Sequence, residues 1–153
     1  MPSAWLNVPL CKQEFNYSCM AACVRMVLAH HGRSLAEAEL RQLLDTRADG
    51  TKARNLTAVA SLGFEVQLDS ANLSQLREAL ATGLPPIVFV DTGSLDYWKI
   101  DCAHVAVVVG IDDTSVYLND PFFDTAPQQT SLPSFLLGWA RNGHLAAIVR
   151  PPP

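Results

Sequence analysis

Residues 11–32, CKQEFNYSCMAACVRMVLAHHG, contain three of the four cysteines of the chain: Cys11, Cys19 and Cys23. A cysteine can ligate a metal, form a disulfide, pack in a core or act as a nucleophile, and its surroundings decide which. We expect a helix from residue 18 to about residue 31, so Cys19 lies in the first helical turn. Backbone N–H groups are unpaired there and the helix dipole is positive, which favours the thiolate form of a cysteine. Cys19 is therefore the candidate nucleophile.

The other three cysteines are weaker candidates for the nucleophile. The helix that contains Cys23 is apolar on nearly every side, which indicates a buried helix, so we expect this thiol to be packed and unreactive. Cys102 is also expected to be a packing residue, and so is Cys11. A reducing compartment would keep all of these thiols free.

The same cysteines could in principle form a zinc site together with His30 or His31. At about 1.5 Å per residue, His31 lies about 18 Å from Cys19 along the helix, so one ion cannot join them. We expect both histidines to be solvated near the helix end, where the dipole favours them. Nothing else in the chain requires a metal ion or an organic cofactor, so we expect neither.

A cysteine nucleophile needs a base, a group that orients the base, and hydrogen-bond donors for the oxyanion. His104 opens the apolar run HVAVVVGI, which places an imidazole at the edge of the expected core. Asp120 ends the run SVYLND, just before a proline. If residues 112–114 form a three-residue hairpin loop, Asp120 lies diagonally from His104 on the same sheet face, about 7–8 Å away between backbones. An even-numbered loop would put the two side chains on opposite faces.

Gln13, six residues before Cys19, could supply one oxyanion donor through its side-chain amide. The backbone N–H of Cys19 would then be the second donor. Composition alone does not single out this glutamine.

Taken together, Q13-EFNYS-C19, the run HVAVVVG from His104 and LND-P at Asp120 resemble the papain-like cysteine peptidases. Among these the chain is most similar to the bacteriocin-processing, double-glycine-leader peptidase domains and their stand-alone relatives, over about residues 8–150. The resemblance implies that Cys19 is the nucleophile, His104 the general base, Asp120 its orienter and Gln13 the oxyanion donor. It also implies a peptide or protein substrate.

Two features depart from the family pattern. The family usually has Asp-Cys-Gly at the nucleophile, whereas this chain has Ser18-Cys19-Met20. Met20 could therefore narrow or cover the cleft. Many relatives are fused to a membrane transporter, so a transporter is a possible partner here. The resemblance supports the cysteine chemistry more strongly than it supports the double-glycine substrate class.

The elements that must position these residues are helical first and extended afterwards. We expect helices over residues 18–31, 34–45, 52–63 and 73–83, the second with Ser34 as its cap and Glu37 in a capping box. We expect strands at 64–68, 85–91, 104–111, 115–120 and 144–150, with a short helix at 132–143. This order predicts an α+β, papain-like fold in which N-terminal helices, including the cysteine helix, pack on a C-terminal antiparallel β-sheet. We expect one domain over residues 1–153, with a disordered tail at 151–153.

Composition excludes several other classes of function. The 153 residues carry a net charge of −4 and no cluster of Lys and Arg, so nucleic acid and anionic membranes are poor candidates as partners. No apolar run approaches the roughly 20 residues that span a bilayer, and the N-terminus does not read as a signal peptide. We therefore expect a soluble, cytoplasmic protein without a membrane segment. The sequence says nothing about its oligomeric state.

The predicted function is that of a cysteine peptidase that works through a thioester at Cys19 and processes a leader peptide or another small protein. Two alternatives use the same scaffold. A peptide-binding module would keep the fold with a cleft that Met20 blocks. A transglutaminase-like acyl transferase would pass the acyl group to an amine instead of water. Tyr97 and Trp98, which precede the histidine strand, are expected in the core or at its rim, with a cleft-lining role possible.

Overall fold

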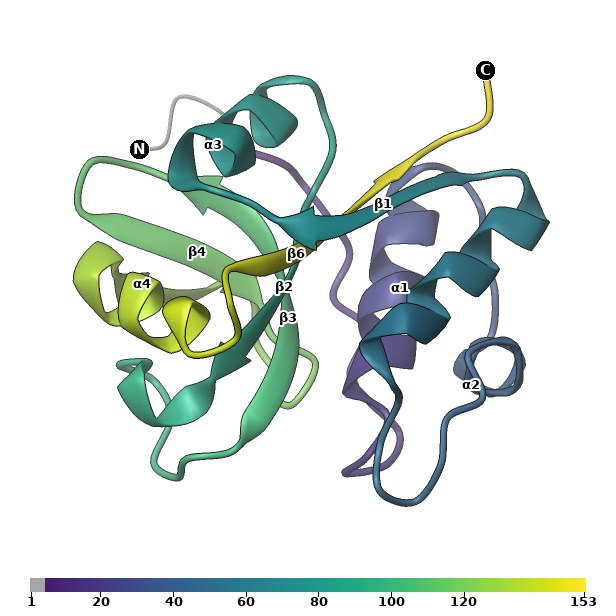
Figure 1. The fold of residues 1–153 in the computed structure, drawn as a ribbon, viewed down its shortest axis with the longest axis horizontal. Helices are drawn as coiled ribbons and strands as arrows, with labels where there is room; N and C mark the ends of the chain where they lie inside the picture. Colours follow the sequence, from purple (N-terminus) through teal and green to yellow (C-terminus); the bar gives the residue numbers. More distant parts are fainter. Residues whose placement is uncertain (1–4) are drawn as a thin grey trace.

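The computed structural model describes residues 5–153, whose helices and strands are arranged as Figure 1 shows. The α-helices are α1 (Cys19–His30), α2 (Glu37–Leu43), α3 (Leu73–Ala81) and α4 (Leu132–Ala140), and two 3-10 segments are η1 (Ala53–Leu62) and η2 (Thr92–Ser94). The strands are β1 (Glu65–Ser70), β2 (Ile87–Asp91), β3 (Ala103–Ile111), β4 (Ser115–Asn119), β5 (Gln128–Ser131) and β6 (Leu145–Arg150). The predicted α+β class, with N-terminal helices and a sheet built mainly from the second half, is confirmed.

The six strands form one sheet in the order β1-β6-β2-β3-β4-β5. Each neighbouring pair is antiparallel. The central strands β2 and β3 are short apolar runs whose successive residues point to opposite faces, so each strand supplies two layers of core.

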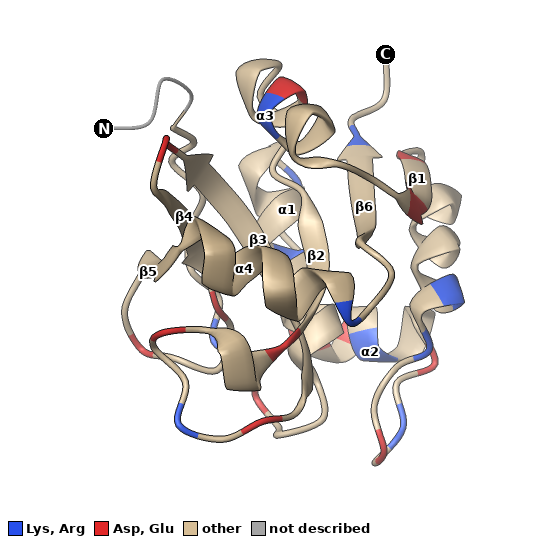
Figure 2. Ribbon diagram, turned by 60° about the vertical axis from the view of Figure 1, so that its left-hand side comes forward, with Lys and Arg blue, Asp and Glu red and all other residues tan. Residues whose placement is uncertain are grey.

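The two faces of the sheet are covered by different helices. Phe89 and Val107 pack in a cluster with the buried side of α1, whereas Val88 and Val108 pack in a second cluster with residues of α3 and α4. In Figure 1, α1 and α2 accordingly lie on one side of the sheet and α4 on the other. Figure 2 shows charged residues mainly in loops and on helices, while β3 and β4 carry none.

Helix α1 forms as the sequence predicts. Residues 20–24 and 26–28 are buried, so the helix is central to its core cluster. It ends before Gly32, whose φ of +87° is a left-handed conformation that glycine adopts without strain. In the described part of the chain, no helix is both long and apolar enough to cross a membrane.

Four expectations about local structure are wrong. Helix α2 begins at Glu37 after Ala36, so Ser34 does not cap it, and Glu37 is fully buried instead of completing a capping box. Residues 53–62 form a 3-10 segment, not an α-helix. Strand β5 was not expected, because its sequence QQTS is short and polar and lies at a sheet edge.

The two histidines at the end of α1 are the fourth correction. They are half-buried, not solvated, and both bond to backbone carbonyl groups. His30 Nε2 lies 3.0 Å from Gly83 O, and His31 Nε2 lies 3.1 Å from Val149 O. Their role is to tie the end of α1 to neighbouring segments.

Candidate active site

The hairpin β3–β4 brings His104 and Asp120 together by a route that the sequence did not predict. Near the turn Ile111 pairs with Val116, so the connection has an even number of residues, and this alone would put the two side chains on opposite faces. A bulge between Val108 and Gly110 then inserts one extra residue into β3. Beyond it Val107 pairs with Asn119, which is the register expected from a three-residue loop. The bulge therefore restores the predicted meeting.

His104 and Asp120 form a buried ion pair. His104 Nε2 lies 2.7 Å from Asp120 Oδ1, and the side chains are 5% and 0% exposed. This contact confirms that the two residues meet. A charge-assisted hydrogen bond of this length, shielded from water, fixes the plane of the imidazole ring.

Asp120 is held by more donors than His104 alone. Its Oδ1 also accepts from the backbone N–H of Phe122 at 3.0 Å. Its Oδ2 accepts from Tyr97 Oη and from Trp98 Nε1, each at 2.9 Å. The carboxylate thus receives four hydrogen bonds, which compensate for its burial.

Tyr97 and Trp98 have a role that the sequence did not reveal. Both belong to the loop between β2 and β3, and both orient Asp120 through hydrogen bonds. The Trp98 ring also packs edge-on against His104, with 5.0 Å between ring centroids, and against Phe122 at 4.8 Å. These rings cover the histidine–aspartate pair. An aromatic pair before a histidine strand was the signal in the sequence, but nothing there pointed to Asp120.

The electrostatics of the pair favour a protonated His104. Burial lowers the pKa of His104, but hydrogen bonds with Asp120 and with the Cys19 side chain outweigh it and raise that pKa from 6.5 to about 10. Burial would raise the pKa of Asp120, but the hydrogen bonds from His104 and Trp98 lower it overall. The pair is therefore an imidazolium bonded to a carboxylate.

Cys19 is the other partner of the imidazole. It is half-buried at the first position of α1. The Cys19 side chain lies close enough to His104 to contribute to the raised pKa of the imidazole. Because Nε2 of His104 is bonded to Asp120, Nδ1 is the ring nitrogen left to interact with the thiol. The imidazole therefore bonds to the carboxylate and has its other ring nitrogen available for the nearby thiol.

Gln13 is held in place by one hydrogen bond from its backbone and one from its side chain. Its backbone N–H donates to Pro121 O at 2.8 Å, directly after Asp120, and its side-chain Nε2 donates to Phe15 O at 2.8 Å. Nε2 carries a second hydrogen that is free to donate elsewhere. The N–H of Cys19 precedes the first bond of α1, which runs from Ala22 N to Ser18 O. The Gln13 amide and the Cys19 N–H thus each have a hydrogen that could be donated to a bound group.

The other cysteines differ in their surroundings. Cys23 is fully buried, its Sγ lies 3.4 Å from Val105 O, and burial raises its pKa well above 9.0, so the expectation of a quiet packing thiol is confirmed. Cys11 is half-buried against the α1 cluster, as expected. Cys102 is exposed, so the prediction that it packs in the core is wrong.

Met20 does not cover a cleft. Its side chain is 2% exposed and packs in the core cluster of α1. The side chain that replaces the usual glycine therefore adds to the core, and the expectation that it narrows or blocks the site is not met.

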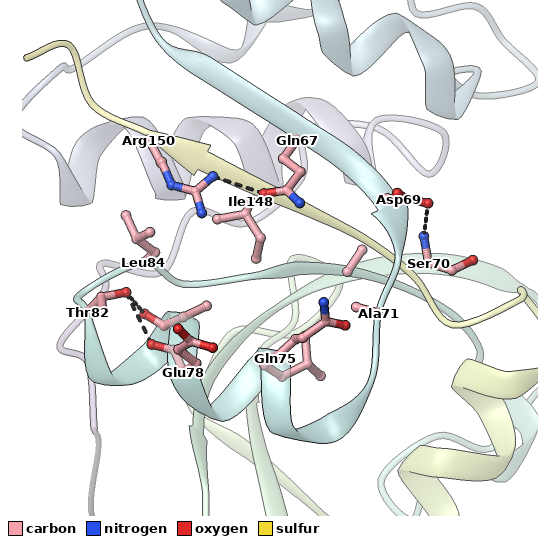
Figure 3. A pocket seen from close by; sticks show the side chains of 13 residues that line it. Gln67, Asp69, Ser70, Ala71, Gln75, Glu78, Thr82, Leu84, Ile148 and Arg150 are labelled. Atoms are coloured by element: carbon pink, nitrogen blue, oxygen red, sulfur yellow. Dashed lines mark hydrogen bonds between the residues drawn. The ribbon is translucent and has the colours of Figure 1, made fainter.

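A pocket of about 350 Å³ lies elsewhere, between α3 and the strands β1 and β6. Figure 3 shows its polar lining, including Gln67, Glu78 and Arg150. None of the candidate site residues lines it. The chemistry and this hollow are separate features of the molecule.

The fold agrees with the comparison with known families. The sequence profile of the peptidase C39 family matches residues 7–149. The chain belongs to the peptidase C39 family. It is 33% identical to an uncharacterised protein of Methanothermobacter marburgensis over 111 residues, which are 72% of this chain and 69% of that protein.

Other C39 relatives are parts of transporters. The chain is 32% identical to the transport/processing ATP-binding protein ComA of Streptococcus pneumoniae over 117 residues, which are 75% of this chain and 15% of ComA. The crystal structure of the peptidase domain of Streptococcus ComA, a bifunctional ABC transporter involved in quorum sensing, superimposes with a TM-score of 0.78 at 25% identity. That match covers 95% of this chain and 99% of the domain.

A third comparison extends the likeness in fold. A double-glycine-motif protease from an AMS/PCAT transporter, solved in complex with its leader peptide, matches with a TM-score of 0.76 at 21% identity. The match covers 97% of this chain and 95% of that one. The chain therefore has the fold of the bacteriocin-processing peptidase domains, as the sequence predicted.

Proposed function

We propose that this C39 family member is a cysteine peptidase in which Cys19, His104, Asp120 and Gln13 carry out the reaction. The observation that supports this best is the position of the His104 imidazole, which bonds to the buried Asp120 at 2.7 Å and lies near enough to Cys19 for that side chain to help raise its pKa. A thiol, a base and an orienting carboxylate in this order are what nucleophilic catalysis by cysteine requires.

Acylation begins with Cys19 as a thiolate and His104 as an imidazolium. The Cys19 thiolate attacks the carbonyl carbon of the scissile peptide bond, and the carbonyl oxygen becomes an oxyanion. The second Nε2 hydrogen of Gln13 and the backbone N–H of Cys19 stabilise this charge. The His104 imidazolium then donates its Nδ1 proton to the departing amine, the C–N bond breaks, and a thioester at Cys19 remains.

Deacylation uses the same groups in the opposite sense. Neutral His104 takes a proton from water, and the resulting hydroxide attacks the thioester carbonyl while the two donors again hold the oxyanion. The C–S bond breaks, the carboxylic acid leaves, and the thiolate–imidazolium pair is restored. Asp120 keeps the ring in place throughout, because its other donors hold it.

The substrate class comes from the relatives. Since similar domains act in double-glycine-leader processing beside ABC transporters, we propose a peptide with a Gly-Gly leader as substrate, a transporter as a possible partner and the cytoplasm as the compartment. The same reasoning supports one papain-like domain for the chain.

A peptide-library digest tests this function. We expect cleavage products that together gain the mass of one water, with cuts enriched after Gly-Gly. Mass spectrometry of the products with wild type and with Cys19→Ala identifies both the cuts and their dependence on the thiol. Products that gain an added amine would point to acyl transfer, and no thiol-dependent products at all would overturn the peptidase proposal.

Iodoacetamide labelling separates an enzyme from a binding module. At about pH 6 we expect Cys19 to be alkylated about tenfold faster than Cys102, because the imidazolium of His104 stabilises the Cys19 thiolate. Accessibility alone predicts the reverse order, since Cys102 is exposed and Cys19 is half-buried. Peptide mapping by mass spectrometry gives the two rates. His104→Ala should abolish the preference, whereas labelling that follows exposure in the wild type would favour a binding module.

A further inference from the structure

A buried acidic residue outside the four candidate residues bonds to the chain neighbours of both proposed oxyanion donors. Glu37, the first residue of α2, is fully buried. Its Oε1 accepts from the backbone N–H of Glu14 at 3.0 Å and lies 3.2 Å from Ser18 Oγ. Its Oε2 accepts from Arg41 Nε at 2.9 Å. A buried carboxylate is costly unless it is fully paired, so these contacts explain why it is tolerated but not why it is there.

The positions of its partners in the chain suggest the reason. Glu14 directly follows Gln13, and Ser18 directly precedes Cys19. One oxygen of Glu37 therefore holds both ends of the loop that carries the two oxyanion donors. A stabilised oxyanion needs donors placed to within a few tenths of an ångström, and loops seldom supply that without support from a rigid element.

Further contacts inside the loop point the same way. Ser18 Oγ accepts from the N–H of Phe15 at 3.0 Å, and its hydroxyl hydrogen is shared between Phe15 O and Glu37. The Gln13 amide also donates to Phe15 O. The guanidinium of Arg41 lies 4.6 Å from the centre of the Phe15 ring. The loop is thus fastened to α2 through Glu37 and Arg41 and has little freedom of its own.

We propose that Glu37 is a positioning residue that sets the spacing between the Gln13 amide and the Cys19 N–H. The proposal rests on the proposed function only in that an oxyanion must form at Cys19. Glu37 does not touch the thiol or the imidazole, so it acts on the oxyanion and not on the formation of the thiolate.

The same contact links the identity of residue 18 to that of residue 37. An aspartate at residue 18 would place a second carboxylate next to Glu37 Oε1 in a buried setting, where like charges repel strongly. Serine can instead donate to Glu37. The hydroxyl of Ser18 and the buried Glu37 are therefore parts of one arrangement.

Two reagents that attack the same thiol test the proposal. Acylation of Cys19 by p-nitrophenyl acetate passes through an oxyanion, whereas alkylation by iodoacetamide forms none. For Glu37→Ala we expect the acylation rate to fall about tenfold or more and the alkylation rate to stay within about twofold. Glu37→Gln keeps an acceptor oxygen for Glu14 N–H and the Ser18 hydroxyl and loses only the bond from the partly exposed Arg41, so it should retain most of the acylation rate. Cys19→Ala supplies the background for both reagents.

If circular dichroism shows that Glu37→Ala does not fold, a second pair of variants still tests the proposal. Ser18→Asp should lower acylation about tenfold, and Glu37→Gln added to it should recover most of that loss, because only one carboxylate then remains. The proposal is overturned if Glu37→Ala acylates like the wild type, if acylation and alkylation fall together in folded protein, or if the Ser18→Asp loss is the same with Glu37 and Gln at position 37. Failure of the peptidase proposal appears separately, as a wild type that acylates but cleaves no peptide.

Discussion

Cys19→Ala is expected to lower the rate of peptide cleavage by at least about 10⁴-fold, because no other group can form the thioester. His104 and Asp120 without the thiol could only activate water weakly. The half-buried position of Cys19 at the start of α1 means that the fold should not change, so substrate binding should persist. Initial rates of cleavage and substrate affinity, measured on the same preparation, check both parts.

Cys23→Ala is the matched control, one helical turn further along. Its thiol is fully buried and bonded only to Val105 O, so cleavage should stay within about threefold of the wild type. Removal of the sulfur from a packed core should instead lower the free energy of unfolding by about 1–2 kcal/mol, which thermal unfolding detects. If both variants lose cleavage equally, the assignment of Cys19 is wrong.

The contact between His104 and Asp120 could be predicted, but the loop length assumed in that prediction was wrong. Counting residues back from the turn gave the correct register at the site, although the loop is even-numbered and the bulge near Val109 compensates. A bulge of this kind depends on what lies beside the strand: the N-terminal segment bonds there, from Leu6 N to Val109 O at 2.9 Å. Such a long-range cause leaves no local pattern in the sequence.

Glu37 shows the opposite failure, in which a local pattern misleads. Ser34 followed three residues later by glutamate is a capping-box sequence, but the helix begins only at Glu37. The carboxylate bonds to Ser18 instead, 19 positions away in the chain, and to Glu14. Tertiary contacts that satisfy a buried charge outweigh a cap worth about 1 kcal/mol.

Gln13, Tyr97 and Trp98 show which parts of the site could not be predicted from the residues alone. Gln13 came from the family resemblance alone, because a glutamine in a loop carries no chemical signal of its own. The bonds of Tyr97 and Trp98 to Asp120 could not be predicted, since the loop between β2 and β3 has no periodic pattern that fixes where its side chains go. Apolar strands were predictable from their pattern, whereas the polar edge strand β5 and the contacts of these loop residues were not.

Asp120→Asn should have the second large effect, and the geometry explains why the isosteric amide is a poor replacement. Each carboxylate oxygen accepts from at least one group that can only donate: Oδ1 from the N–H of Phe122, and Oδ2 from the indole N–H of Trp98. The NH₂ of an asparagine would meet one of these donors in either orientation. We therefore expect kcat/KM to fall roughly 10²- to 10⁴-fold.

The variant should also change the pH dependence of cleavage in a defined direction. In the wild type the His104 imidazolium persists until the pH approaches about 10, so the alkaline limb of the kcat/KM profile lies there. Removing the carboxylate removes a cause that raises this pKa, so in Asp120→Asn the alkaline limb should move to lower pH by about 1–3 units. NMR titration of the His104 ring checks the shift independently of turnover.

The stability of the fold should also depend on pH through His104 and Asp120, and the two residues act in opposite pH directions. The folded pKa of His104 is raised from 6.5, so its contribution is complete below pH 6.5 and is lost as the pH rises toward about 10. The pKa of Asp120 is lowered from 3.8, so its contribution is present above pH 3.8 and is lost as the pH falls through the folded value. The melting temperature of Asp120→Asn should therefore differ most from the wild type between these limits and less near pH 10.

Asp124→Asn is the control for charge, because it removes the same charge from a side chain that is 79% exposed on the same segment. Exposed pairs contribute little, so this variant should keep the wild-type pH profile and nearly its melting temperature. If Asp120→Asn keeps the alkaline limb and loses no more stability than Asp124→Asn, then Asp120 does not hold the imidazolium. In that case the contact between imidazole and carboxylate would describe the packing of the site but not its mechanism.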